Sequence, residues 1–187
     1  RINDKRQQTP PERDIPKIIL KKSKVLLSQT NPYCESYLIS TAQSENTPDI
    51  PSDSVALTVT SPPFLDIVDY EGDNWLRCWF MGADPTRVRI SNHKKIEKWQ
   101  MFIHNTLREL ARVTKPGGHI AFEVGEVRKG SIKLERNVIS ACVGLPLKAL
   151  GVMINKQEFT KTSNCWGVNN NQSGTNSNRI IILTKTP

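Results

Sequence analysis

Apolar and polar residues alternate along the chain at two spacings, and the spacing separates predicted strands from predicted helices. Residues 55–60 have the sequence Val-Ala-Leu-Thr-Val-Thr, a short run rich in β-branched residues, which predicts a buried strand. Across residues 96–113 the apolar residues return every three or four positions, which predicts an amphipathic helix. Residues 119–124 form another short apolar run and predict the next strand. The order strand, helix, strand is typical of a parallel sheet with a covering helix.

The flanking parts of the chain predict further elements, and one stretch shows no single period. Residues 65–96 hold aromatic residues and then basic ones without regular spacing. Residues 161–178 are rich in Asn, Ser and Gly and predict an exposed loop. The remaining predictions are a helix over 15–27, a strand over 35–41, a loop or short helix over 44–54, a helix over 132–149 bent near Pro146, and strands over 152–160 and 180–186. This order predicts an α/β fold with a mostly parallel sheet, in which a terminal hairpin adds one antiparallel strand.

Composition indicates where the protein works and which kinds of partner it could bind, but it says little about its activity. The net charge of +8 fits a polyanionic partner, although many unrelated soluble proteins have a similar charge. No apolar stretch has the length that spans a bilayer, so we expect no membrane partner, and the pattern of cysteines given next favours a cytoplasmic protein. The cysteines lack the paired spacing of a zinc site or a disulfide framework, and they are Cys34, Cys78, Cys142 and Cys165. We therefore expect no metal.

The sequence Ser61-Pro62-Pro63-Phe64 follows the predicted strand 55–60 directly. We call these four residues, 61–64, the proline corner. Two successive prolines have no backbone N–H to donate, so the strand must stop there and leave carbonyl groups unpaired. The result is a rigid bend that carries a hydroxyl group, carbonyl oxygens and an aromatic ring. Open α/β sheets bind their ligands at this end of their strands.

The proline corner resembles the catalytic signature of S-adenosylmethionine-dependent amino-methyltransferases, [Asp/Asn/Ser]-Pro-Pro-[Tyr/Phe], found in enzymes that methylate cytosine N4 or adenine N6 in DNA. Residues 53–57 lead into the corner as in those enzymes, and residues 65–70 resemble the stretch that follows it in one branch. Residues 110–125 are similar to the family's helix, Lys-Pro-Gly-Gly turn and strand. The resemblance covers roughly residues 36–186. It implies a Rossmann-like methyltransferase sheet with helices on both faces.

The resemblance also implies a chemistry for the corner. In the family, the side chain at the Ser61 position and the carbonyl of the first proline, here Pro62, accept hydrogen bonds from the amino group of the target base. Pro63 completes the bend, and Phe64 would stack on a base flipped out of double-stranded DNA. Flipping costs a few kcal/mol, and one aromatic stack returns about 1–3 kcal/mol. Serine in the first position favours cytosine N4 over adenine N6 by analogy with the family.

Other residues are candidates for a role in catalysis or nucleic-acid binding, and each also has a purely structural interpretation. Glu123 stands where some cytosine methylases carry a carboxylate in the pocket, or else it is a surface carboxylate at the end of a strand. The basic group after residue 86 could bind phosphates, or form a solvated face. The amide-rich loop 161–178 could contact bases, or serve as a linker. The candidate nucleic-acid-binding residues are Asp69, Arg87, Arg89, Lys94, Lys95 and Trp166.

One expected motif is missing from the sequence. The family binds its cofactor through a glycine-rich sequence, Asp-Pro-Phe-x-Gly-x-Gly, and residues 31–36 match it only faintly, without either glycine. The cofactor-binding residues are therefore unknown, and the missing half could precede Arg1, follow Pro187 or belong to a second chain. We expect residues 1–33 to form a polar lead-in with a short amphipathic helix, and residues 34–187 the catalytic half of a methyltransferase domain.

Three functions remain open at this point. The first is a DNA methyltransferase of the kind that belongs to restriction–modification systems. The second is a non-catalytic nucleic-acid-binding subunit, or a fragment of the fold that lacks its own cofactor loop. The third is a methyltransferase that acts on RNA or on a protein amide nitrogen.

Overall fold

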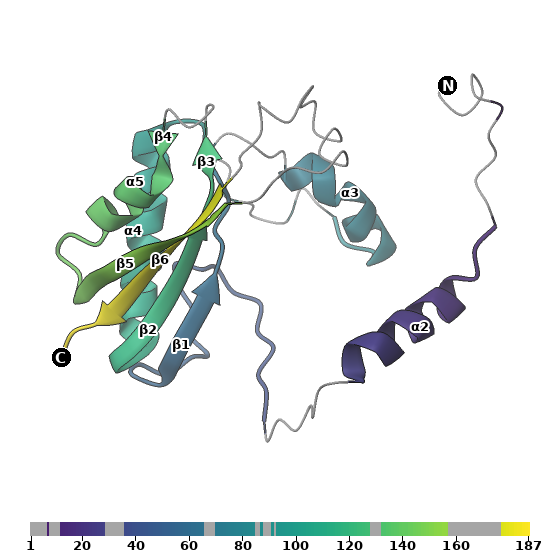
Figure 1. Cartoon of the computed structure of the whole chain (residues 1–187), viewed down its shortest axis with the longest axis horizontal. Coiled ribbons are helices and arrows are strands. Elements are labelled where there is room, and N and C mark those ends of the chain that lie inside the picture. Colours follow the sequence, from purple (N-terminus) through teal and green to yellow (C-terminus); the bar gives the residue numbers. More distant parts are fainter. Residues whose placement is uncertain are drawn as a thin grey trace. The chain divides into compact units, whose positions relative to one another are not determined.

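A computed structural model of the chain describes residues 7, 12–28, 36–65, 70–84, 87, 91, 93–127, 132–156 and 177–187. The chain divides into two units, Arg1–Ser40 and Thr41–Pro187. The first unit contains helix α2, Ile15–Leu27, which has the predicted bounds (Figure 1). The side chain of Asp14 caps it by accepting a hydrogen bond from the backbone N–H of Lys17 at 3.0 Å. None of the residues of α2 is buried.

The second unit is built on a four-stranded sheet in the order β1-β2-β6-β5 (Figure 1). β1 runs parallel to β2, and β6 runs antiparallel to both of its neighbours, so β1, β2 and β5 point the same way. The predicted α/β class, with one antiparallel strand from a terminal hairpin, is therefore confirmed. The strands are β1 at Val55–Thr60, β2 at Thr114–Val124, β5 at Leu147–Lys156 and β6 at Ser177–Lys185.

Helices α4, Ile96–Val113, and α5, Leu134–Ala141, pack together on one face of this sheet (Figure 1). The strands point their apolar residues at these helices in register, since Ile120 pairs with Leu183 and Phe122 with Ile181. All four of these side chains are fully buried. Each such side chain contributes about 1.5–3 kcal/mol by leaving water. The core therefore lies between the centre of the sheet and the two helices.

The opposite face of the sheet is open among the described residues. Leu57, Val59 and Met153 lie on it and are between 58% and 75% exposed. The described helices that contact the sheet, α4 and α5, lie on the other face, so the predicted covering of both faces is not met by the described part of the chain. The segment 132–149, predicted as a second long helix, is helical only over Leu134–Ala141.

That segment, 132–149, is a correction to the sequence prediction. Helix α5 ends at Ala141, and β5 begins at Leu147. Gly144 has a φ of 80°, a left-handed conformation that ends the helical path, and Pro146 follows. β4, Ile132–Lys133, precedes the helix and pairs with β3, Glu126–Val127, in a separate two-stranded sheet.

Two further predictions differ from the structure. Residues 36–41 contain no strand, and the nearest pairing is an isolated bridge between Gln43 and Asn46. Helix α3, Tyr70–Phe80, lies within the stretch where the sequence showed no period. Residues 157–160 and 161–176, predicted as strand end and loop, lie outside the described residues. The predicted helix 96–113 is confirmed at its bounds as α4.

The glycine turn predicted ahead of the strand 119–124 lies inside β2, which begins at Thr114, and forms a bulge there. Val55 pairs with Thr114, but Leu57 pairs with His119, so three extra residues of β2 loop out. Gly117 has a φ of 74°, which favours glycine. At Gly118 a Cβ atom would lie 2.8 Å from Cγ2 of Thr114 and 2.9 Å from the carbonyl oxygen of Lys115, so the bulge leaves no room for a side chain there.

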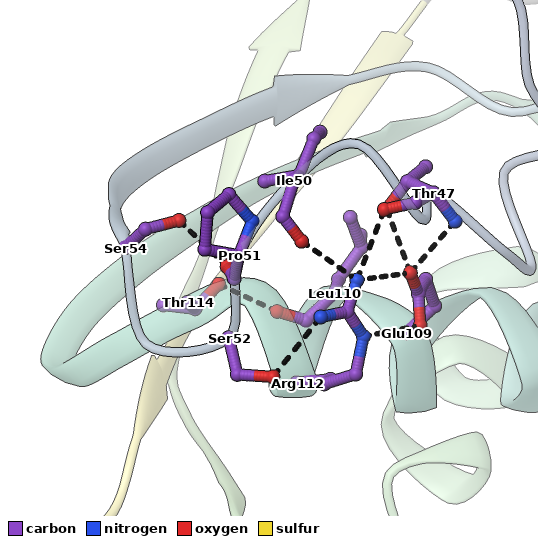
Figure 2. A network of polar contacts seen from close by, with 9 residues as sticks. All are labelled: Thr47, Ile50, Pro51, Ser52, Ser54, Glu109, Leu110, Arg112 and Thr114. Carbon is purple, nitrogen blue, oxygen red and sulfur yellow. Dashed lines mark hydrogen bonds and ion pairs between the residues drawn. The ribbon is translucent and has the colours of Figure 1, made fainter.

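A polar network fixes the loop that leads into β1 (Figure 2). Glu109 accepts hydrogen bonds at 2.7 Å from both the backbone N–H and the hydroxyl of Thr47. Arg112 donates to the same carboxylate at 2.7 and 2.9 Å, and to the carbonyl oxygens of Thr47 and Ile50 at 3.0 Å. These bonds hold the pKa of Glu109 down at about 2, with the hydrogen bond from Arg112 as the largest cause. The start of β1 is thereby tied to the end of α4.

Candidate active site

The proline corner begins where β1 ends, beside the end of β2. Thr60 is the last residue of β1 and pairs with Phe122 of β2. The strand predicted in front of the corner has the predicted bounds, but it is not buried as predicted, because β1 lies at the edge of the described sheet and its residues are half-buried or exposed. Because β1 and β2 are parallel, their carboxyl ends share one edge of the sheet, the edge where α/β folds bind ligands.

Exposure changes from residue to residue within the corner. Ser61 is exposed, Pro62 is buried, and Pro63 and Phe64 are half-buried. Leu65, the next residue, is 1% exposed and belongs to the main core. Solvent therefore reaches the residue that carries the hydroxyl group, while the core holds the far end of the bend.

A tryptophan on α4 binds the corner directly. The indole Nε1–H of Trp99 donates a hydrogen bond of 2.9 Å to the carbonyl oxygen of Pro63. Trp99 is only 1% exposed, so water does not compete for this bond. Trp99 lies on the apolar stripe of the predicted helix 96–113, so its burial agrees with the sequence pattern. Its contact with the corner leaves no sequence pattern, because 36 residues separate the partners.

The ring of Phe64 lies against the residue that follows β2. A Cβ atom placed on Gly125 would be 2.8 Å from Cε2 of Phe64, closer than real contacts allow. Phe64 is half-buried and packs against the core cluster. Glycine at position 125 therefore makes the room that this ring occupies.

Glu123 lies on β2, next to the corner. It is half-buried and pairs with Ile180 of β6. Ser61 and Glu123 each come one residue after the Thr60–Phe122 pair, so the two occupy matching places on neighbouring chains of the sheet. Glu123 alternates with Phe122 and Val124, which puts it on the open face of the sheet.

The predicted nucleic-acid-binding residues are only partly described. Lys94 and Lys95 are exposed and directly precede α4, at the end of the helix where Trp99 contacts the corner. Arg87 is exposed and lies 3.7 Å from the carboxylate of Asp84. Asp69, Arg89 and Trp166 lie outside the described residues.

A buried ion pair at the same edge of the sheet was not predicted. Arg179 of β6 pairs across the sheet with Val124, the last residue of β2, and its guanidinium lies 2.9 Å from Glu135 of α5. Glu135 is 7% exposed, and its Oε2 has no hydrogen-bond partner among the described residues. A charge pair formed by residues 44 positions apart leaves no pattern in the sequence.

Two general features concern the described residues alone. They contain no group of three or more His, Cys, Asp or Glu side chains placed to hold a metal ion. Among their helices, none combines the length and the apolar character that crossing a membrane requires.

Comparison with known proteins adds resemblances of fold. No protein-family model and no curated protein matches the chain. TTHA0409, a proposed DNA modification methylase from Thermus thermophilus complexed with S-adenosyl-L-methionine, is 22% identical with a TM-score of 0.44, over 74% of this chain and 50% of that one. The cytosine-N4-specific PvuII DNA methyltransferase is 12% identical with a TM-score of 0.46, over 73% of this chain and 44% of that one.

A third similar structure is that of an RNA methyltransferase rather than a DNA methylase. The 16S rRNA (adenine(1408)-N(1))-methyltransferase from Catenulisporales acidiphilia is 13% identical with a TM-score of 0.41, over 78% of this chain and 60% of that one. The chain spans about half the length of the DNA methylases it matches. Similarities of this size do not identify a family, so the function is inferred from the corner and its neighbours.

Proposed function

We propose that this chain is the catalytic half of an S-adenosylmethionine-dependent DNA amino-methyltransferase. The observation that carries the proposal is the Ser-Pro-Pro-Phe corner at the carboxyl end of β1, with an exposed serine and a half-buried aromatic ring. The resemblance of the flanking stretches 53–57 and 110–125 to the same enzymes supports it. The target is the exocyclic amino group of cytosine N4 or adenine N6 in double-stranded DNA.

The corner supplies acceptors and a stacking surface for one flipped base. The lone pair of an exocyclic amino group is delocalised into the ring, so the group is a poor nucleophile. Ser61 and the carbonyl of Pro62 accept hydrogen bonds from its two N–H groups and help the nitrogen to become pyramidal, while Phe64 stacks on the ring. Glu123 stands beside them to accept the proton that the methylated nitrogen releases.

The methyl donor is already activated, so this chain needs to contribute little beyond aligning the base with it. S-adenosylmethionine supplies an electrophilic methyl group on a positively charged sulfur. The described residues do not include a glycine-rich loop that would hold it, and the sequence contains none of the family's form. We therefore assign no residue of this chain to the cofactor.

Exposed basic residues favour a nucleic acid as the partner. Lys94 and Lys95 lie at the start of α4, near the corner, and Arg87 is exposed as well. Contacts from such side chains to phosphates would orient a duplex without reading its sequence. The net charge of +8 acts in the same direction.

The test is transfer of labelled methyl groups from S-adenosylmethionine to duplex DNA, RNA and protein in direct competition. The proposal expects label in DNA, with N4-methylcytosine or N6-methyladenine identified by mass spectrometry after digestion. Label in RNA or protein alone would replace it by the third function.

The second candidate is a non-catalytic nucleic-acid-binding subunit, or a fragment of the methyltransferase fold that lacks its own cofactor loop. The open face of the sheet favours it, since Val59 and Met153 stay exposed there. Calorimetry of S-adenosylmethionine binding to this chain alone separates the two. Micromolar binding supports an independent enzyme, and millimolar or weaker binding supports the second candidate.

A further inference from the structure

We infer that Trp99 and Gly125 are positioning residues that fix the proline corner in the geometry that accepts a base. The inference rests on the proposed function and deepens it. Both residues act on the base indirectly, through Pro63 and Phe64. Trp99 holds the corner from α4 through the carbonyl of Pro63. Gly125 holds it from the end of β2 by admitting the ring of Phe64.

The hydrogen bond from Trp99 controls more than one atom. A peptide unit is planar, so orienting the Pro63 carbonyl also orients the N–H and Cα of Phe64. The proline ring fixes φ of Pro63 near −65°, which leaves ψ as its one soft dihedral. Trp99 sets that dihedral and thereby fixes the direction of the Pro62 carbonyl relative to Phe64. These are two of the groups assigned to the base.

Gly125 supplies the second point of attachment. The atoms that a Cβ at position 125 would meet are Cε2, Cδ2 and Cζ of Phe64, at 2.8 to 3.4 Å. A stiff aromatic ring cannot avoid such a contact without rotating or moving outward. With glycine there, the ring lies against the end of β2 and presents its remaining surface outward.

The residues that hold the corner are buried, whereas the residues proposed to contact the base are exposed or half-buried. Trp99 is 1% exposed and Gly125 is buried, whereas Ser61 is exposed and Phe64 half-buried. A corner held by its buried side stays in place whether or not a base is bound. Pre-organisation of this kind is expected to act on the rate of transfer rather than on the affinity for DNA.

The test compares Trp99→Phe with Leu107→Ala. Phenylalanine keeps an aromatic ring in the core but removes the N–H donor. Leu107 is also fully buried on α4, two turns away, and its side chain has no polar group that could bind the corner. In Trp99→Phe, amide hydrogen exchange at Phe64 and Leu65 should quicken by about tenfold or more relative to the centre of β2. The kcat for methyl transfer should fall about 10- to 100-fold, with KM for DNA changed less than about threefold.

Leu107→Ala should lower overall stability without either effect. If the two variants change exchange and kcat alike, or if Trp99→Phe changes neither, the inference is wrong. Gly125→Ala provides an independent variant should Trp99→Phe not fold, and it is expected to reproduce the same pattern. If the wild-type chain transfers no methyl group, the proposed function fails, and the exchange measurement alone then decides the role of Trp99.

Discussion

Removing the charge of Glu109 tests how the loop before β1 is held. In Glu109→Gln the side chain keeps its size but loses the carboxylate that binds Thr47 and Arg112. The pKa of Glu109 falls from 4.5 to about 2 in the folded protein. At about 1.4 kcal/mol per pKa unit, this shift corresponds to roughly 3 kcal/mol of stability at neutral pH. The side chain of Arg112 is 36% exposed, and solvent screening there lowers our expectation to about 2 kcal/mol.

The sign of this contribution gives a pH dependence. A carboxylate with a lowered folded pKa stabilises fully above its unfolded pKa of 4.5, and the contribution is lost as the pH falls through about 2. The free energy of unfolding of wild type and variant should therefore differ by about 2 kcal/mol at pH 7 and converge toward pH 2.

Urea unfolding at several pH values, followed by circular dichroism, measures this difference. Glu97→Gln is the matched control, because Glu97 is an exposed carboxylate in the first turn of the same helix. Its loss should cost no more than about 0.5 kcal/mol through the helix dipole. A Glu109→Gln variant as stable as wild type at pH 7, or a gap that does not narrow in acid, would refute the reasoning.

Three further predictions concern the second unit. Gly117→Ala should lower stability by about 1 kcal/mol in thermal unfolding, because φ is 74° there; unchanged stability would contradict this. Arg179→Ala should cost about 3 kcal/mol in urea unfolding, since it strands the buried carboxylate of Glu135; a loss below about 0.5 kcal/mol would contradict it. Burial raises the pKa of Cys142 to about 11, so at pH 8 iodoacetamide should label Cys78 long before Cys142, as mass spectrometry of peptides would show.

The parts of the fold that the sequence predicted correctly are those with one unbroken period. Helix α4 buries one continuous stripe against the sheet, and β1 is a short β-branched run ended by prolines, so both match their predicted bounds. Helix α3 escaped prediction because its apolar pattern, Trp75, Leu76, Trp79 and Phe80, covers less than two helical turns, and these side chains are all more than half exposed in the fold. The helix predicted over 132–149 was right for 134–141 and wrong beyond it, where Gly144 has a left-handed φ of 80° and β5 begins at Leu147.

The candidate site, like the fold, has a part that the sequence could predict and a part that it could not. The corner could be predicted because its four residues are consecutive in the sequence. Its attachments to Trp99 and Gly125 could not, because they arise only when α4 and the end of β2 come together in the fold. Phe64 contacts the core, so Phe64→Ala should lose stability as well as activity.

Ser61→Ala provides the most direct test of the proposal that the corner positions a base for methylation. Because Ser61 is exposed, the free energy of unfolding of the Ser61→Ala variant should stay within about 0.5 kcal/mol of the wild-type value. The initial rate of labelled methyl transfer to duplex DNA should fall by about 100-fold or more if the hydroxyl holds the amino group in the transition state. Ser140→Ala, an exposed serine on α5, should transfer at the wild-type rate. Equal transfer by wild type and Ser61→Ala would contradict the proposal.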